Sequence, residues 1–170
     1  FRRVLFRSLN SSYNTATGAL SLYQNETGSE NTANGYSVLY SNFNSTGNTG
    51  MGYRALYTNT GNYNTAIGSY AQEANTTAAY NTSIGRRSLT NNTTGQRNTA
   101  VGYNALSVNI SGNNNTVIGY AANASSGNLS NATAIGYSTV VDASNKVRIG
   151  NSNVTSIGGQ VGWTVFSDGR

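Results

Sequence analysis

The chain has 170 residues, of which only 9% are charged, and it contains no Cys, His or Pro. Asn (27), Thr (21), Ser (21) and Gly (20) make up more than half of it, whereas Leu, Ile, Val and Phe together number 31. With neither Cys nor His and with five carboxylates, we expect no disulfide, no metal site, no cofactor and no acid–base catalysis. So few large aliphatic residues favour disorder or an Asn- and Tyr-rich aggregating chain, unless a regular pattern argues otherwise.

The first segment, FRRVLFRS at residues 1–8, differs from everything after it. It resembles the translation of a sequencing-adapter end, so we expect it to be foreign to the fold; a truncated signal peptide or a basic arm is the alternative. Without it, seven basic residues face five acidic ones, and the net charge falls from +5 to +2. We therefore expect no nucleic-acid partner. No run of 18 apolar residues occurs, so we predict no membrane span.

From residue 14 onwards the chain repeats a phrase of the type N-T-A-I-G. The phrase begins at Asn14, Asn31, Asn48, Asn64, Asn81, Asn98, Asn115 and, in a degraded form, Ala132. The intervals are all 17 residues, apart from one of 16. Because a disordered chain has no need of a fixed period, the repeat predicts a folded array with one unit per coil.

Each unit favours a short strand. A unit of 17 residues is too short for two helices and their turns, and Gly, Asn, Thr and Ser are poor helix formers. β-Branched and aromatic residues suit a pleated surface, and Asn and Gly suit the turns beside it. We predict an all-β fold over residues 9–140, a parallel β-solenoid of about eight coils and roughly 38 Å in length.

The positions within the unit suggest separate roles. The first is Asn, which can hydrogen-bond its copies and the turn backbone in neighbouring coils; the second is Thr, a strand residue. The fifth is Gly, which permits a positive φ or a close backbone approach. In two consecutive units these residues are Asn98, Thr99, Gly102, Asn115, Thr116 and Gly119. We expect the fourth and ninth positions to fill the interior, and so thin a core favours a homo-oligomer.

The N-T-A-I-G and N-T-A-V-G phrases resemble the N-x-x-I-G repeats in the heads of trimeric autotransporter adhesins. Similar repeats occur in tail-fibre proteins of phages and bacteria. The resemblance covers residues 14–140. It implies a parallel β-roll of three chains located outside the cell, on the cell surface or on a virion.

The period fails after Val141, and we expect residues 141–170 to form a neck or junction. The stretches KVRIG (146–150), IGGQVGW (157–163) and SDGR (167–170) resemble the segment before the C-terminal intramolecular chaperone of phage tailspikes, the peptidase S74 family. The resemblance implies self-cleavage at Ser167 and Asp168, with a lysine partner and the chaperone beyond Arg170. Alternatively, Ser-Asp-Gly is simply a turn.

Three further patterns each have two interpretations. The tyrosines at the sixth position suit carbohydrate stacking, or packing between coils. The Thr column suits an ice-binding face, or plain strand stacking. The Asn-x-Ser/Thr sequences are glycan acceptors in a secreted eukaryotic protein and otherwise a by-product of turn chemistry. They include Asn25, Asn44, Asn75, Asn92, Asn109, Asn123, Asn131 and Asn153.

The sequence as a whole predicts a mechanical role without catalysis in residues 14–166. We expect a shaft or head segment of an extracellular or virion fibre, most readily a trimer. The alternatives are a surface adhesin head that binds a glycan or receptor directly and, less favoured, an ice-binding solenoid.

Overall fold

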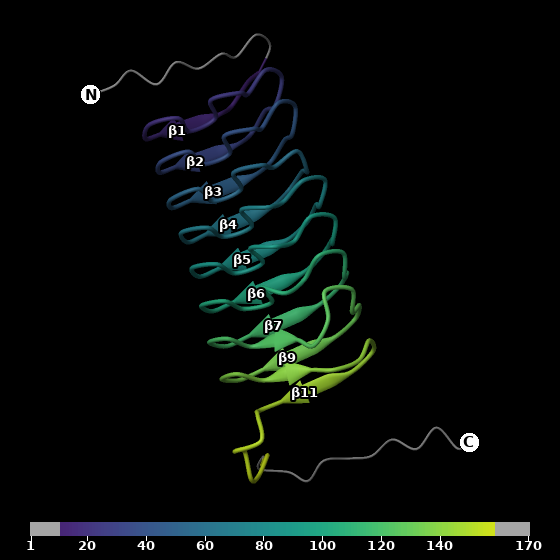
Figure 1. Cartoon of the computed structure of the whole chain (residues 1–170). Coiled ribbons are helices and arrows are strands. Elements are labelled where there is room, and N and C mark those ends of the chain that lie inside the picture. Colours follow the sequence, from purple (N-terminus) through teal and green to yellow (C-terminus); the bar gives the residue numbers. More distant parts are fainter. Residues whose placement is uncertain (1–10, 159–170) are drawn as a thin grey trace.

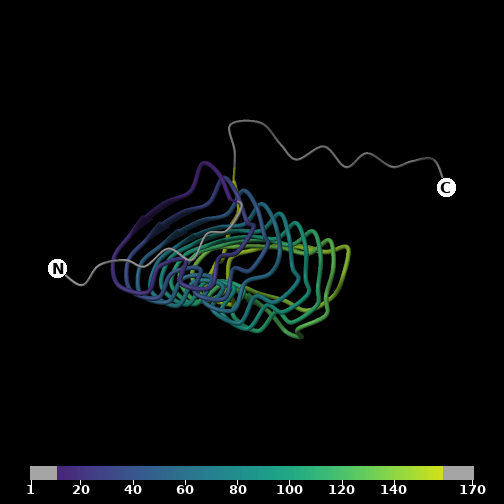
Figure 2. The same ribbon diagram turned by 90° about the horizontal axis from the view of Figure 1, so that it is seen from above.

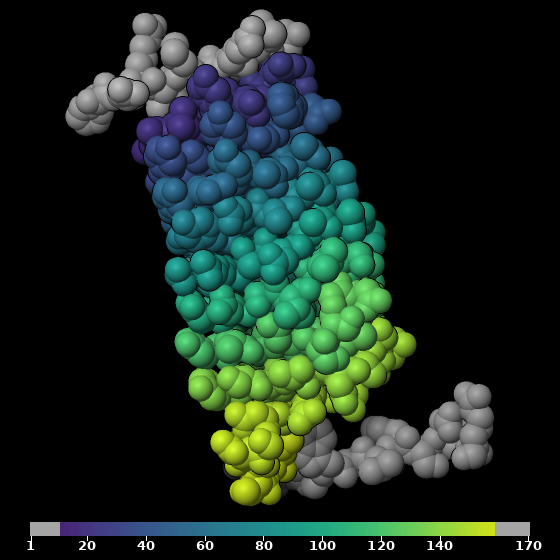
Figure 3. Space-filling view, in the orientation of Figure 1, coloured from purple at the N-terminus to yellow at the C-terminus, as the bar shows by residue number. Residues whose placement is uncertain are grey.

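The computed structural model describes residues 11–158, and these form a β-solenoid up to the strand that ends at Ile149 (Figure 1). Short strands lie one above another along the axis, and the described residues contain no helix. Seen along the axis, each coil is a flattened loop, and successive coils are turned slightly with respect to one another (Figure 2). The space-filling view shows a continuous rod (Figure 3). The fold class predicted from the 17-residue period is confirmed.

One nine-stranded parallel sheet, in the order β1-β2-β3-β4-β5-β6-β7-β9-β11, runs the length of the rod. Its strands are β1 (Thr15–Thr17), β2 (Thr32–Asn34), β3 (Thr49–Met51), β4 (Thr65–Ile67), β5 (Thr82–Ile84), β6 (Thr99–Val101), β7 (Thr116–Ile118), β9 (Thr133–Ile135) and β11 (Val147–Ile149). From β1 to β9 each second-position Thr pairs with the next, as Thr99 does with Thr116. Identical register on every rung makes the coils superimposable.

The solenoid continues past residue 140, the boundary that the repeat suggested. Strand β11 pairs with β9, Val147 opposite Thr133, so the last coil closes in 14 residues. A separate two-stranded sheet joins β8 (Asn123–Ala124) to β10 (Val140–Val141). The sequence period fails before the backbone pairing does, because strand hydrogen bonds do not depend on side-chain identity.

The fifth-position glycines have both of the properties considered in the sequence analysis, a positive φ and a close approach of neighbouring backbone. Gly102 has a φ of 133° and Gly119 one of 139°, values that an L-residue rarely adopts. A Cβ on Gly102 would also overlap the carbonyl oxygen of Gly119 in the next coil. Each glycine lets the chain turn the corner after the strand while the next backbone passes directly above it.

The corner also contains positive φ at residues other than Gly. Asn104 has a φ of 53° and Leu106 one of 51°, and the equivalent seventh and ninth positions repeat this in the coils from Leu20 to Leu106. A left-handed residue with a side chain is intrinsically unfavourable by about 1–2 kcal/mol. Hydrogen bonds between stacked coils stabilise this conformation: the Leu106 N–H donates to the Ala122 carbonyl of the next coil (2.9 Å).

The interior differs from the prediction in one column. The ninth-position leucines, such as Leu89 and Leu106, are fully buried as expected. The fourth position, however, points outward: Ile84 is 40% exposed and Ile118 39%. The small third position, for instance Ala100, points inward instead. Side chains alternate along a strand, so an inward third position forces the second and fourth out.

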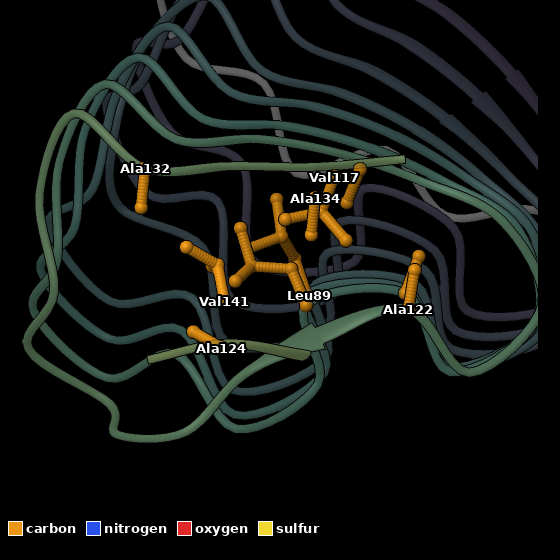
Figure 4. Close-up of a cluster of buried hydrophobic side chains, with 10 residues drawn as sticks. Leu89, Val117, Ala122, Ala124, Ala132, Ala134 and Val141 are labelled. Carbon is orange, nitrogen blue, oxygen red and sulfur yellow. The ribbon is translucent and has the colours of Figure 1, made fainter. Parts of the chain in front are cut away.

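The apolar interior consists of two separate clusters. One extends from Leu22 to Ala71. The other extends from Leu89 to Val141, and Figure 4 shows its side chains converging between opposite walls of the coil. Buried Gln72 and Ser83 lie between the two, and the Gln72 Nε2–H donates to the Ser83 hydroxyl (2.9 Å). Gln72 occupies the ninth position, where neighbouring coils have Leu.

Candidate functional site

The first-position asparagines form a buried ladder, as predicted. The Asn115 backbone N–H donates to Asn98 Oδ1 (3.0 Å), and the same bond joins each coil to the next from Asn14 to Ala132. The Asn98 Nδ2–H donates to the Gly112 carbonyl (2.8 Å). These side chains provide hydrogen-bond partners for the backbone of the turn before each strand, because buried N–H and C=O groups need partners.

A second asparagine ladder was not recognised in the sequence. It consists of the twelfth-position residues Asn25, Asn42, Asn59, Asn75, Asn92 and Asn109, all buried. From Asn42 onwards each Nδ2 donates to the Oδ1 of the preceding member, over 2.5–3.3 Å. Each also donates to a nearby carbonyl in its own coil. The Gly112 carbonyl accepts from both Asn98 and Asn109, so the ladders share an acceptor. The signal was present, because these residues recur at the same 17- and 16-residue intervals.

Four of the candidate glycosylation sites belong to this second ladder. Asn25, Asn75, Asn92 and Asn109 are at most 1% exposed, and each Nδ2 is hydrogen-bonded. A glycan would replace an Nδ2 hydrogen and needs solvent around it. These four are therefore incompatible with a glycan in the folded coil.

The remaining candidate acceptors lie nearer to solvent. Asn44, Asn131 and Asn153 are exposed. Asn123 is half-buried, and its Nδ2–H donates to the Ser107 hydroxyl (3.0 Å). The proposed cleavage residues Ser167 and Asp168 lie outside the described residues.

The outer face of the nine-stranded sheet carries an uncharged strip, here called the strand strip. It consists of the second- and fourth-position residues of β1–β7 and β9. The second position is Thr throughout, and from β3 onwards the fourth is Met51, Ile67, Ile84, Val101, Ile118 and Ile135. These six side chains are exposed or half-exposed. An aliphatic row of this length on an outer face is the most unusual surface feature of the rod.

Tyrosines stack in columns beside the sheet and on the far side of the corner. Tyr103, Tyr120 and Tyr137 stack with ring centroids 5.0 and 5.6 Å apart. This confirms packing between coils, although Tyr120 remains 54% exposed. Arg86 continues the column, and its Nη1–H donates to the Tyr103 hydroxyl (3.3 Å).

Two tyrosine columns face each other in the second and third coils and enclose a hollow, here called the tyrosine groove. Tyr36 and Tyr53, at the sixth position, form one wall, and Tyr40 and Tyr57, at the tenth, form the other. Leu20, Ser37 and Arg54, at the seventh position, form the floor. The hollow measures about 230 Å³ and is open to solvent on one side. No strand residue lines it.

The charge in the groove is balanced. Arg54 Nη2 lies 3.0 Å from Glu73 Oε1, and the Arg54 guanidinium lies over the Tyr57 ring, 4.1 Å from its centroid. Both charged side chains are about one-third exposed. The ion pair therefore leaves little net charge for an ionic ligand.

Other functional arrangements are missing from the described part of the chain. Residues 11–158 contain no group of three or more metal-ligating His, Cys, Asp or Glu side chains. They also contain no helix long and apolar enough to cross a membrane. Comparisons with protein-family models, curated proteins and solved structures found no match.

Proposed function

We propose that this chain is a shaft or head segment of an extracellular or virion fibre in which three copies associate side by side through the strand strip. The observation that carries the proposal is the row of exposed aliphatic side chains from Met51 to Ile135 on an uncharged sheet face. A repeated aliphatic row loses unfavourable contact with water when another copy covers it. Because all coils share one register, the row continues along the rod and suits an equally long partner.

The size of the strip indicates how much surface such an assembly must include. Eight coils about 4.8 Å apart and strands of three residues give a strip of roughly 38 by 10 Å. Stable interfaces cover about 800 Å² on each partner, roughly twice this area. The flanking tyrosines therefore belong in the interface as well. Tyr103, Tyr120 and Tyr137 lie on one side, and Tyr63 and Tyr80, stacked at 5.3 Å, on the other.

The interior gives an independent reason for association. Most coils bury a single Leu, and most of the other apolar residues in the interior are Ala or Val. Burying a large aliphatic side chain contributes about 1.5–3 kcal/mol, whereas ordering each residue costs about 1–2 kcal/mol of backbone entropy. Ladder hydrogen bonds and contacts between copies must offset the difference. The resemblance to trimeric adhesin heads and tailspike junctions supports three copies and a location on a cell surface or virion.

The test is the mass of the protein in solution, measured by light scattering after size exclusion. We expect three times the chain mass of 17.8 kDa. Ile84→Asp, on the strand strip, should reduce the mass to that of one chain and leave a β-type circular dichroism spectrum. Val108→Asp is the matched control, because Val108 is also 40% exposed but lies at the eleventh position, outside the strip.

Three results would overturn the proposal: a single-chain mass, a two-chain mass, or a mass that Ile84→Asp leaves unchanged. The ice-binding alternative uses the same face, since its Thr column also points outward. A single-chain mass together with thermal hysteresis, abolished by substituting Thr99 and Thr116, would replace the fibre by that alternative.

A further inference from the structure

The tyrosine groove exists only where the repeat provides tyrosine on both sides of the corner. In the second and third coils the sixth and tenth positions are all Tyr. Later coils keep sixth-position tyrosines, as at Tyr103 and Tyr120, but have Ser107 and Ala124 at the tenth. In the fourth coil Tyr70 occupies the seventh position, which forms the floor of the groove in the coils before it. Packing between coils alone does not require the second wall, so the hollow is a local feature.

Stacking limits which parts of the wall tyrosines a ligand can reach. The Tyr36 and Tyr53 rings stack on each other at 8° and 5.4 Å, and the Tyr40 and Tyr57 rings at 19° and 5.1 Å. Ring faces inside each pair are therefore covered by the neighbouring ring. What remains accessible is the aromatic edge and the phenol O–H, which both donates and accepts hydrogen bonds. Such walls suit a ligand that has many hydroxyl groups and a compact apolar surface.

The floor argues against a charged ligand. Arg54 is the one basic residue lining the hollow, and Glu73 already pairs with it at 3.0 Å. A ligand carboxylate or sulfate would have to displace Glu73 or lie beside it, and like charges at that distance repel. The buried Arg54 Nε–H has no hydrogen-bond partner among the described residues. That nitrogen is closed to solvent, so it offers a ligand no donor, and a neutral ligand leaves the ion pair undisturbed.

The size of the hollow limits the ligand to a small unit. Pockets for drug-sized molecules measure about 300–1,000 Å³, and this one measures about 230 Å³. Because one side is open, only one unit of a longer molecule needs to enter while the rest follows the surface. A proline-rich peptide fits less well, since proline rings need uncovered aromatic faces along an extended groove.

We propose that the tyrosine groove binds one sugar ring of a neutral oligosaccharide. Sugar hydroxyls pair with the hydroxyls of Tyr36 and Tyr40, and the C–H surface of the sugar lies against the Tyr53 and Tyr57 edges. The inference deepens the proposed function, because it assigns the displayed fibre segment a ligand class. Its test is read separately from the measurement of the number of chains.

The experiment is binding of the full chain to an array of neutral oligosaccharides ending in glucose, galactose, mannose, fucose or N-acetylhexosamine. Sialylated and sulfated counterparts and a decaproline peptide are included. We expect retention by neutral members, confirmed by titration calorimetry with the strongest one. Ser37→Leu should reduce its affinity at least tenfold, because it fills the floor and the first coil already accommodates Leu20 at that position. Tyr40→Phe should weaken it several-fold while keeping the ring stack.

Phe43→Ala is the matched control. Phe43 is an aromatic side chain of the second coil that is 43% exposed and does not line the groove, so its truncation should leave the affinity unchanged. Binding of no neutral member, preference for acidic members or decaproline, or equal loss in Phe43→Ala would each overturn the inference. Mass is measured on the same samples. Three-chain protein without sugar binding refutes only this site, and single-chain protein that binds sugar refutes only the assembly.

Discussion

The buried asparagine ladder gives the sharpest prediction, and Asn98→Ala is the perturbation that tests it. The substitution removes the acceptor of the Asn115 N–H and the donor to the Gly112 carbonyl. Gly112 still accepts from Asn109 (3.0 Å), but the Asn115 N–H is left buried without a partner. An orphaned buried group costs about 1–3 kcal/mol and a lost hydrogen bond about 1 kcal/mol. We expect the free energy of unfolding to fall by about 2–4 kcal/mol.

The assay is equilibrium urea unfolding at fixed protein concentration, because association changes apparent stability. The midpoint should fall with little change in slope. Amide exchange should show the loss at Asn115 first, since coils interact mainly with their neighbours. Asn44→Ala is the matched control: Asn44 is exposed, and a surface substitution should stay within about 0.5 kcal/mol. Equal effects of the two substitutions would refute the ladder as a source of stability.

Three other predictions follow from the coil. Gly102→Ala should prevent folding or lower the unfolding free energy by more than about 3 kcal/mol, because φ is 133° and the added Cβ would overlap the backbone of the next coil. Gly158→Ala should be neutral in the same unfolding experiment, because a Cβ there meets nothing within 4 Å. The double substitution Gln72→Leu/Ser83→Ala should raise the unfolding free energy by about 1–2 kcal/mol. It replaces both partners of the Gln72–Ser83 hydrogen bond by apolar groups, removes a buried Oε1 without a partner and joins the two apolar clusters. A lower melting temperature would contradict this. The hydrogen bond from Lys146, with its charge, lowers the pKa of the Asp142 carboxyl. The stability that the ionised Asp142 contributes is present above its unfolded-state pKa and is lost as the pH falls through its folded-state pKa. Amide protection of β11 should therefore decrease in acid, and it should decrease less in Asp142→Asn.

The repeat predicted much of the fold because its period alone specifies one coil. Positions that meet only their own copies, such as Asn98 and Asn115 or Gly102 and Gly119, could be interpreted without knowing the path of the chain. Their partner in a stacked array is the same residue one unit later, and hydrogen bonding or close approach follows from residue type. The second asparagine ladder obeys the same rule and was visible in principle.

The direction of side chains was decided by the tertiary structure. The outward fourth position illustrates this: Ile84 has the residue type of a core position, yet it lies outside because the third position, Ser83 in the same strand, faces the interior. Strand alternation leaves two choices of inward face, and only the opposite wall of the coil selects one. The strand strip, the main support for association, follows from that choice.

The tyrosine groove likewise needed the folded corner. Tyr36 and Tyr40 are four residues apart, and nothing in their spacing shows that the chain between them adopts positive φ and brings the two columns face to face. The sequence by itself determined the coil, its period, its ladders and its glycines, because these depend on contacts between equivalent positions. Only the tertiary structure decided which columns face water and which face each other, because that depends on how one coil closes on itself.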